Sequence, residues 1–258
     1  MFEEMRSLPK YKFLLRQLIR RDFKTRYRGS LLGVLWSVLN PLLNMLVLSI
    51  VFRQLFHQVE NYMLYLLSGI TIFTFFSEAT TQGMGSIVGN FNLFGKVKLP
   101  KVIFPIAKTL STAISFVITV LVYLIISWCA GLKPSIYYLL IPVALFLVCV
   151  FAAGMSMLLS ALNVFLRDTQ HLYGVICTIW MYVTPILYPL ETTIPEQYQF
   201  VFRLNPMYHY VTFFRDAAFY CQAPSLYTTI AVFAWAIGVF MLGLYVFHKK
   251  QDDFIYYN

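Results

Sequence analysis

Few side chains in this chain of 258 residues have the types and spacing needed for catalysis. His57, His171, His209 and His248 are scattered and match no metal-ligand or metalloprotease spacing. No GxxxxGK[ST] phosphate loop and no GxSxG nucleophile motif occurs in the sequence. Glu78 is the main acid within the long apolar runs, whereas ion-coupled transporters usually need several carboxylates or histidines there. We therefore expect no metal site and no nucleotide site, and any uphill transport would draw its energy from another subunit.

Aromatic side chains are the abundant group, at 18% of the residues. Several of them lie close in sequence to hydroxyl, amide or carboxyl groups, a combination that could bind sugar rings through stacking and hydrogen bonds. The alternative is an aromatic belt at the lipid interface, and the sequence leaves both readings open. The candidate residues for such a substrate channel are Phe73, Phe76, Glu78, Trp180, Tyr182 and Tyr188.

The elements that would hold these residues follow from the composition, which is 59% apolar and 12% charged. A typical soluble domain is about 45–50% apolar and about 25% charged, so a cytosolic enzyme, a disordered chain and a secreted disulfide scaffold are disfavoured. A bilayer crossing needs about 20 apolar residues, and six runs of that kind occur. We expect an all-α integral membrane protein with six transmembrane helices, over residues 31–56, 62–88, 104–131, 136–163, 170–190 and 226–248.

The distribution of Lys and Arg predicts the orientation. Sixteen of the 20 basic residues fall on one side of the six spans, so both termini are expected in the cytoplasm and nucleic acid is not needed to explain the net charge of +9. Residues 1–30 predict a basic amphipathic helix, which would be an interfacial anchor, a docking surface for a partner, or both. Residues 191–222 predict two short re-entrant or interfacial helices on the outer side, at a gate.

Four motifs, in order along the chain, resemble those of type-2 ABC exporter permeases that move polysaccharides. The first is YRGSLLGVLW at 27–36 with LNPL at 39–42, and the second is FGKVKLP at 94–100 with Pro105. The third is LNVFLRD at 162–168, and the fourth is LNPMY at 204–208 with Phe214 and Arg215. The resemblance covers essentially the whole chain, as one permease domain over residues 1–258. It does not distinguish O-antigen, capsule and teichoic acid exporters.

The resemblance implies a homodimer in the bacterial cytoplasmic membrane that binds two copies of an ABC ATPase and exports a lipid-linked glycan. The chain itself would carry no cofactor, because ATP and Mg²⁺ would bind to the partner ATPase. The amphipathic segment and a coupling helix at 91–101 would fit into that ATPase. The implied coupling residues are Arg26, Tyr27, Arg28, Asn92, Phe94, Lys96, Lys98, Lys101, Arg167 and Asp168, and the implied outer gate is formed by Asn205, Pro206 and Arg215.

Three alternatives remain open from the sequence. The first is a type-2 ABC permease for drugs or other lipids, and the second is a membrane glycosyltransferase or acyltransferase. The enzyme would need polar catalytic groups clustered near one interface, and the sequence has no convincing cluster of that kind. The third is a secondary transporter, which would depend on Glu78. The lysines at 96, 98 and 101 could also serve membrane topology alone.

Overall fold

The computed structural model describes residues 11–56, 58–91 and 99–256, and these residues form helices without any strand. Five helices are long and apolar enough to cross a membrane, which confirms an all-helical membrane architecture. Four of the predicted spans correspond to α3 (Leu35–Phe52), α4 (Tyr62–Met84), α6 (Ile103–Cys129) and α12 (Leu226–Lys250). The fifth helix is α7 (Ile141–Phe165), which follows the 3₁₀ helix η3 (Ile136–Leu140).

The predicted span over 170–190 differs from the helix observed there. Helix α8 (Thr169–Val183) has 15 residues, fewer than the roughly 20 that a full crossing requires. It ends because Thr184 precedes Pro185, and the proline ring disfavours helical geometry in the residue before it. Thr184 is accordingly extended, with φ −85° and ψ 128°. A sixth complete crossing is therefore not confirmed by a continuous helix.

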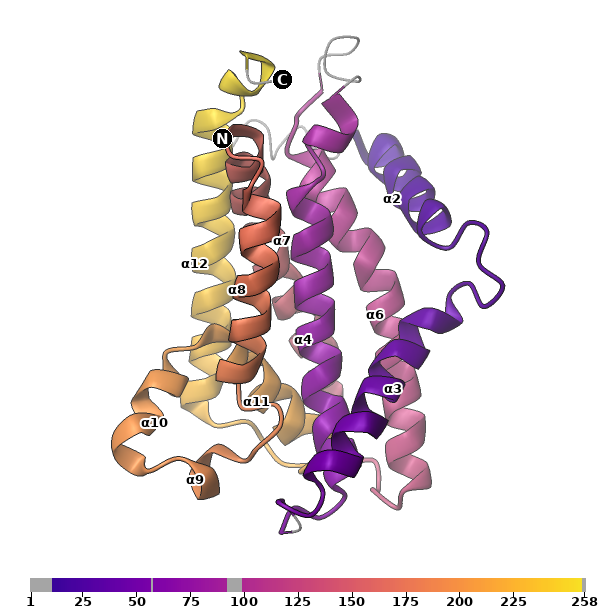
Figure 1. Cartoon of the computed structure of the whole chain (residues 1–258), viewed down its shortest axis with the longest axis vertical. Coiled ribbons are helices and arrows are strands. Elements are labelled where there is room, and N and C mark those ends of the chain that lie inside the picture. The colour runs from indigo at the N-terminus through magenta and orange to yellow at the C-terminus, as the bar shows by residue number, and fades with distance from the viewer. Residues whose placement is uncertain (1–10, 57, 92–98, 257–258) are drawn as a thin grey trace.

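The segment between α8 and α12 forms three short helices, α9 (Leu190–Thr193), α10 (Glu196–Arg203) and α11 (Pro206–Ala218). Helices α10 and α11 lie where two short helices were expected, whereas the single-turn α9 was not expected. A re-entrant or interfacial position for them stays a prediction. Asn205 caps α11 by accepting a hydrogen bond from the Met207 backbone N–H at 3.0 Å, and Pro206 occupies the first turn. Most of α11 is buried against α4, α7 and α12, at the end of the bundle shown at the bottom of Figure 1. We call this end the α11 end.

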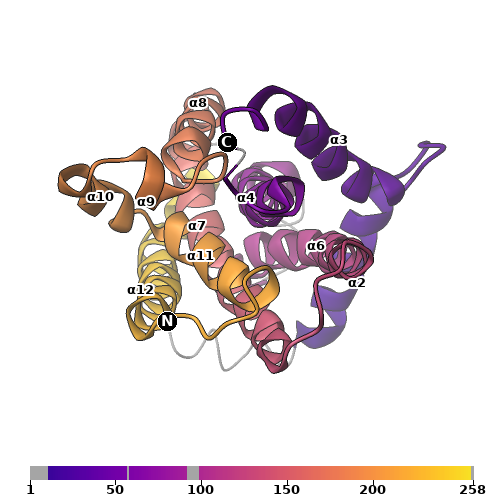
Figure 2. The same cartoon turned by 90° about the horizontal axis from the view of Figure 1, so that it is seen from below.

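Helix α4 lies at the centre of the bundle, with α3, α6, α7 and α11 around it (Figure 2). Most of its side chains are buried. Aromatic rings fill the contacts, because Phe75 stacks on Phe116 with ring centroids 4.1 Å apart and Phe76 stacks on Phe151 at 5.2 Å. Helix α4 also carries the predicted channel residues Phe73, Phe76 and Glu78.

The backbones of α7 and α12 touch where Gly154 and Gly243 meet, and a side chain larger than that of glycine would not fit there. A Cβ added to Gly154 would lie 2.7 Å from the Phe240 backbone, and one added to Gly243 would meet the carbonyl oxygen of Gly154. Small residues at a helix crossing permit this backbone-to-backbone packing, which is a common way for membrane helices to associate. The two glycines thus join α7 and α12 along a tight seam.

Helix α2 (Lys12–Arg26) lies at the side of the bundle, packed against α6 (Figure 1). It is at the end of the bundle opposite to α11, which we call the α2 end. Its Leu18 is buried, whereas Arg16 and Arg20 are exposed, so the helix is amphipathic as predicted. The chain then turns into α3 through Gly29 and Gly33, whose φ values of 78° and 51° lie in the left-handed region that favours glycine. This turn accounts for the glycine spacing in the first motif.

Candidate functional site

A groove of about 550 Å³, with both polar and apolar side chains in its walls, runs between α3, α4 and α8, beneath the C-terminal end of α2. We call it the polar groove for its hydroxyl, amide and carboxylate groups. Polar side chains in membrane helices are costly and usually face protein or a water-filled cavity, so a groove lined in this way is a candidate path for a hydrophilic molecule. Phe73 and Glu78, two of the predicted channel residues, line it. The other lining residues with polar side chains include Asn40, Ser77, Thr81, Gln82 and Thr178.

Pro41 shapes the α3 wall of this groove. Because proline has no N–H, the carbonyl of Ser37, four residues earlier, loses its helical partner. The Thr119 hydroxyl of α6 donates to that carbonyl at 3.0 Å and replaces the missing bond. The missing hydrogen bond of α3 is therefore replaced from a neighbouring helix, as buried backbone in a membrane requires.

Glu78 is paired with a residue from the amphipathic helix. Its carboxylate lies 2.9 Å from Arg26 Nη1, and the side chains are 40% and 16% exposed. Arg26 Nη2 also donates to Thr112 Oγ1 at 2.7 Å, and the Tyr27 hydroxyl lies within hydrogen-bond distance of Ser115 Oγ at 2.8 Å. The structure thus brings two predicted coupling residues against the wall of the groove.

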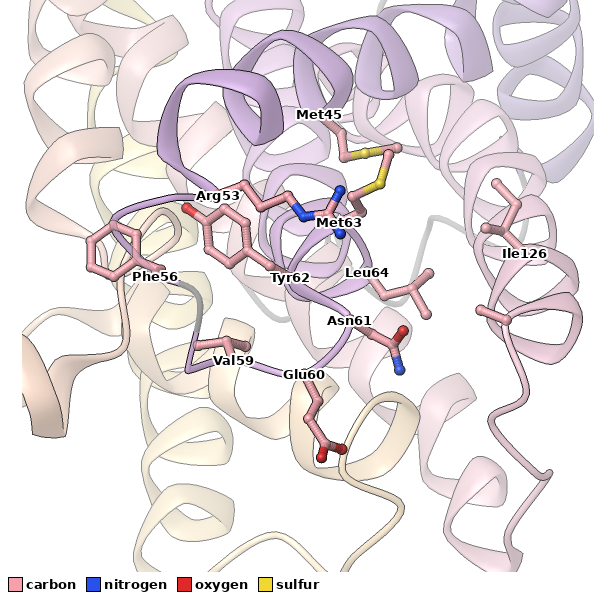
Figure 3. Close-up of a pocket in the computed structure, with 11 residues that line it drawn as sticks. Met45, Arg53, Phe56, Val59, Glu60, Asn61, Tyr62, Met63, Leu64 and Ile126 are labelled. Carbon is pink, nitrogen blue, oxygen red and sulfur yellow. The ribbon is translucent and has the colours of Figure 1, made fainter.

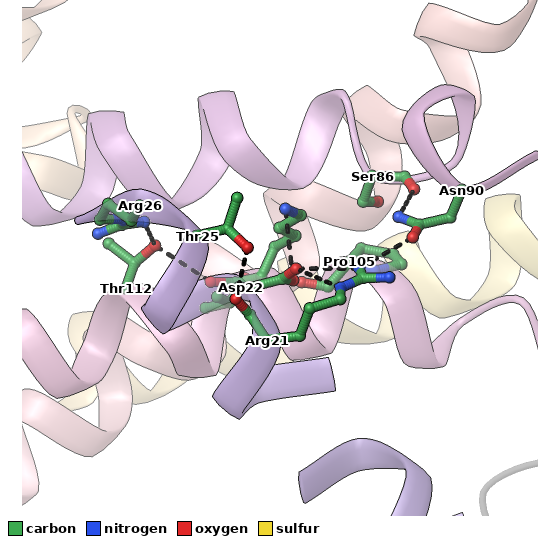
Figure 4. A network of polar contacts seen from close by, with 10 residues as sticks. Arg21, Asp22, Thr25, Arg26, Ser86, Asn90, Pro105 and Thr112 are labelled. Carbon is green, nitrogen blue, oxygen red and sulfur yellow. Dashed lines mark hydrogen bonds and ion pairs between the residues drawn. The ribbon is translucent and has the colours of Figure 1, made fainter. Parts of the chain in front are cut away.

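A second polar cluster fastens α2 to the bundle, and sequence reasoning missed it (Figure 4). Asp22 lies 3.3 Å from Lys108 Nζ of α6 and 2.9 Å from Arg21 Nη2. Arg21 also donates to Asn90 Oδ1 at 2.9 Å, just beyond α4. The available signal was that Asp22 is the one acid between residues 5 and 59. The cluster consequently links α2 to α6 and to the 3₁₀ helix η2 (Val88–Asn90) that follows α4.

The remaining predicted coupling residues do not gather in the described part of the chain. Lys101 donates to the Gln251 carbonyl after α12 and lies 5.7 Å from the Phe254 ring centroid, and burial lowers the pKa of its ammonium group. Arg28 is exposed in the turn after α2, and Arg167 and Asp168 lie at the junction of α7 and α8. Four further predictions lie outside the described residues, namely Asn92, Phe94, Lys96 and Lys98.

The predicted aromatic channel residues of the α8 region occupy different environments. Trp180 packs edge-on against Phe76, with ring centroids 5.1 Å apart, and Phe76 is fully buried. Tyr182 is 58% exposed, and its carbonyl accepts a hydrogen bond from the Tyr188 hydroxyl at 3.1 Å. The rings therefore do not form one continuous surface, and their role in a substrate channel stays a prediction.

Asn205, Pro206 and Arg215, predicted at an outer gate, surround the place where α8 ends. Asn205 Oδ1 accepts from Trp180 Nε1 at 2.7 Å, and Asn205 Nδ2 donates to Thr184 Oγ1 at 2.9 Å. Both contacts hold the start of α11, where Pro206 lies, against the end of α8. These residues are thus brought together as a junction between the two helices.

Arg215 is 5% exposed and lies over the Tyr65 ring, with Cζ 3.6 Å from the ring centroid. All five N–H groups of its guanidinium have acceptors. Nη1 donates to the Pro185 carbonyl at 2.7 Å and to the Tyr65 hydroxyl at 2.9 Å, and Nε donates to Ser68 Oγ at 3.2 Å. Nη2 donates to the carbonyls of Ile186 at 2.9 Å and Tyr65 at 3.2 Å. A Cβ on Gly69 would lie 2.8 Å from Nη2, so the glycine leaves space for this arginine.

A separate hollow of about 530 Å³ opens near the α11 end, between the end of α3, the start of α4 and the end of α6. Arg53 extends into it towards Met63, and Met45 and Ile126 form apolar walls (Figure 3). Glu60 points away from its centre. This hollow contains none of the predicted site residues.

One protein family model and several known proteins are similar to this chain over most of its length. A family model described as "ABC-2 type transporter" matches residues 14–219. The O-antigen export system permease protein RfbA of Myxococcus xanthus is 29% identical over 256 residues, covering 98% of each chain. A protein of the same name from Klebsiella pneumoniae is 29% identical over 243 residues, covering 93% of each chain. The polysialic acid transport protein KpsM of Escherichia coli is 23% identical over 195 residues, covering 74% of each chain.

Proposed function

The chain belongs to the ABC-2 type transporter family, and from this premise we propose that it is the transmembrane permease of a polysaccharide exporter. Membership makes it a multi-pass transport subunit rather than an enzyme, and it implies an ABC ATPase as partner. The relatives named above export O-antigen or transport polysialic acid, and they match nearly the whole chain or three quarters of it. The cargo we propose is a lipid-linked glycan of the O-antigen, capsule or teichoic acid class.

The observation that carries this proposal is the polar groove along α4. A glycan has many hydroxyl groups and no way to cross hydrocarbon unaided, so its path needs hydrogen-bonding walls. The groove offers hydroxyl and amide groups of Ser77, Gln82 and Thr178, whereas the Phe73 ring at its wall is 4% exposed. It is open along one side of the chain, so a single copy encloses only part of a channel.

We infer that two copies complete the channel as a homodimer. The helices that flank the groove expose apolar faces, with Val47 and Ile50 on α3 and Val175 and Ile179 on α8 among their exposed side chains. Pairing of these faces across the groove would cover apolar surface and close the polar path. Each copy would cross the membrane six times if α8 and the extended residues after Thr184 together span the bilayer. Both termini would then lie in the cytoplasm, and α9–α11 would lie at the outer face.

The proposed coupling runs through α2. ATP-driven closure of two ATPase subunits, which bind ATP and Mg²⁺, would push on α2 and on the predicted coupling helix at 91–101. Movement of α2 would reach the groove through the ion pair between Arg26 and Glu78, because this pair joins α2 directly to α4. The bacterial cytoplasmic membrane is the compartment in which such an ATPase and a lipid-linked glycan meet.

The test is export in inverted membrane vesicles that contain the chain, its ATPase and a radiolabelled lipid-linked glycan. We expect ATP to make the glycan resistant to an added glycosidase, and we expect Ser77→Trp and Gln82→Trp to reduce that protection at least tenfold because each fills the groove. Ile230→Trp, on an exposed face of α12, is the matched control and should leave export unchanged. Glycan that stays accessible while drugs or other lipids are moved would refute the proposed cargo.

A further inference from the structure

An open notch lies between α2 and α6 at the α2 end, on a different surface from the groove. Lys12, Leu15, Arg16, Ile19, Arg20 and Ile114 line this notch, which has a volume of about 580 Å³. Lys12, Arg16 and Arg20 recur every four residues on a helix, so their side chains lie on one face. The notch therefore has one cationic wall and one apolar wall.

The three cations of this notch lack acidic partners within the part of the chain that the structure describes. The acids that contact α2 are already engaged, since Asp22 pairs with Arg21 and Lys108 and Glu78 pairs with Arg26. Concentrated positive charge that no acid of the described residues neutralises favours binding of an anion.

The apolar wall continues along α6 towards the opposite end of the bundle. Exposed apolar side chains recur there every three or four residues, which places them on one stripe of the helix. Ile114 belongs both to this stripe and to the notch. The stripe consists of Leu110, Ile114, Val117, Leu121 and Ile125.

We propose that the notch binds an anionic phospholipid of the leaflet on the α2 side. Arginine presents paired N–H donors that match the oxygens of a phosphate, so Arg16 and Arg20 would hold the phosphodiester, with Lys12 beside them. The acyl chains would lie along the α6 stripe. Basic pockets beside membrane helices recognise lipid headgroups in this way. A soluble protein partner fits less well, because the stripe follows a membrane-crossing helix. The site does not depend on the exported cargo.

The test uses the full chain purified in detergent with its ATPase, and native mass spectrometry to count bound lipid. Dioleoyl phosphatidylglycerol is compared with dioleoyl phosphatidylcholine at equal concentration. We expect Arg16→Gln to weaken phosphatidylglycerol binding about fivefold, and the triple change Lys12→Gln, Arg16→Gln, Arg20→Gln to weaken it about a hundredfold. Phosphatidylcholine shares the phosphodiester, but its quaternary ammonium cancels the net charge and is repelled by the cationic wall, so its binding should be weak and should change less than twofold in every variant.

Lys24→Gln is the matched control, since it removes one exposed cation from the same helix outside the notch, and it should change binding less than twofold. If the triple variant fails to fold, the salt dependence of the unaltered protein decides instead, because only phosphatidylglycerol binding should weaken as salt rises. Equal binding of the two lipids overturns the proposal. So does displacement of the lipid by water-soluble glycerophosphoglycerol at the same concentration, which would identify a plain phosphate site. Loss of the ATPase with lipid binding intact would make the notch a protein-docking surface.

Discussion

Replacing Arg215 by Met tests whether this buried arginine holds the junction at the α11 end together. Methionine keeps an apolar stem of similar reach but removes all five donors. The carbonyls of Pro185 and Ile186 then lose their only donors among the described residues. The Tyr65 carbonyl keeps a hydrogen bond from the Ser68 hydroxyl at 2.6 Å.

Each orphaned buried carbonyl costs about 1–3 kcal/mol, so two of them cost about 2–6 kcal/mol. Removing a desolvated cation offsets part of this cost. We therefore expect Arg215→Met to lower the free energy of unfolding by about 2–4 kcal/mol, which is roughly a thirtyfold to thousandfold shift in the unfolding equilibrium. Arg215→Lys should be at least as damaging, because one ammonium cannot reach acceptors on both sides of a planar guanidinium.

The assay is reversible unfolding of the purified chain in mixed micelles, followed by circular dichroism. Arg203→Met is the matched control, since it removes an exposed arginine at the same end of the molecule, and it should change the free energy by less than about 0.5 kcal/mol. Two results would refute the reasoning. One is a stability for Arg215→Met that equals the control, and the other is full rescue by Arg215→Lys, which would mean that charge alone matters.

Three further predictions concern other parts of the structure. Glu78→Gln should weaken export, because it removes the ion pair between α2 and α4, and the remaining export should still depend on ATP hydrolysis. A double-mutant cycle with Arg26→Gln should give a coupling energy of at most about 1 kcal/mol, because the pair is partly exposed; export that follows an imposed ion gradient without ATP would instead indicate ion coupling. Gly243→Ala should destabilise the chain by about 1–3 kcal/mol through a backbone clash, whereas Gly238→Ala, with open space around it, should stabilise it slightly; equal effects in unfolding assays would contradict the tight seam. Asn205→Ala should lower the free energy of unfolding by about 2 kcal/mol, because α11 loses its cap and the Trp180 N–H loses its acceptor. An unchanged free energy would show that the cap is dispensable.

The membrane helices could be predicted well because their signal is local. A long apolar run is recognisable from composition alone, and five of the six expected spans correspond to long helices. The boundaries were less accurate where backbone geometry decides. Helix α3 begins at Leu35 rather than residue 31 because the preceding turn needs left-handed glycine at position 33. Pro185 likewise ends α8 early, and that signal was present in the sequence but was outweighed by the apolar run.

The contacts that the candidate residues make could not be predicted from the sequence. Glu78 was noticed as an isolated acid and Arg26 as part of a basic helix, yet their pairing depends on how α2 packs against α6. Arg215 was assigned to a gate, and three of its five hydrogen bonds go to backbone carbonyls, which leave no trace in the side-chain pattern. Tertiary placement, rather than residue type, determines these contacts.

The seam between α7 and α12 has a consequence for motion. Where backbones touch at Gly154 and Gly243, the two helices cannot slide or rotate past each other without opening a void or a clash. We therefore expect α7 and α12 to behave as one rigid body. Helices α2, α3 and α8 lie at the periphery of the bundle, and many of their side chains are exposed. A rearrangement of the molecule is therefore expected to displace peripheral helices and to leave the packing of α7 on α12 unchanged.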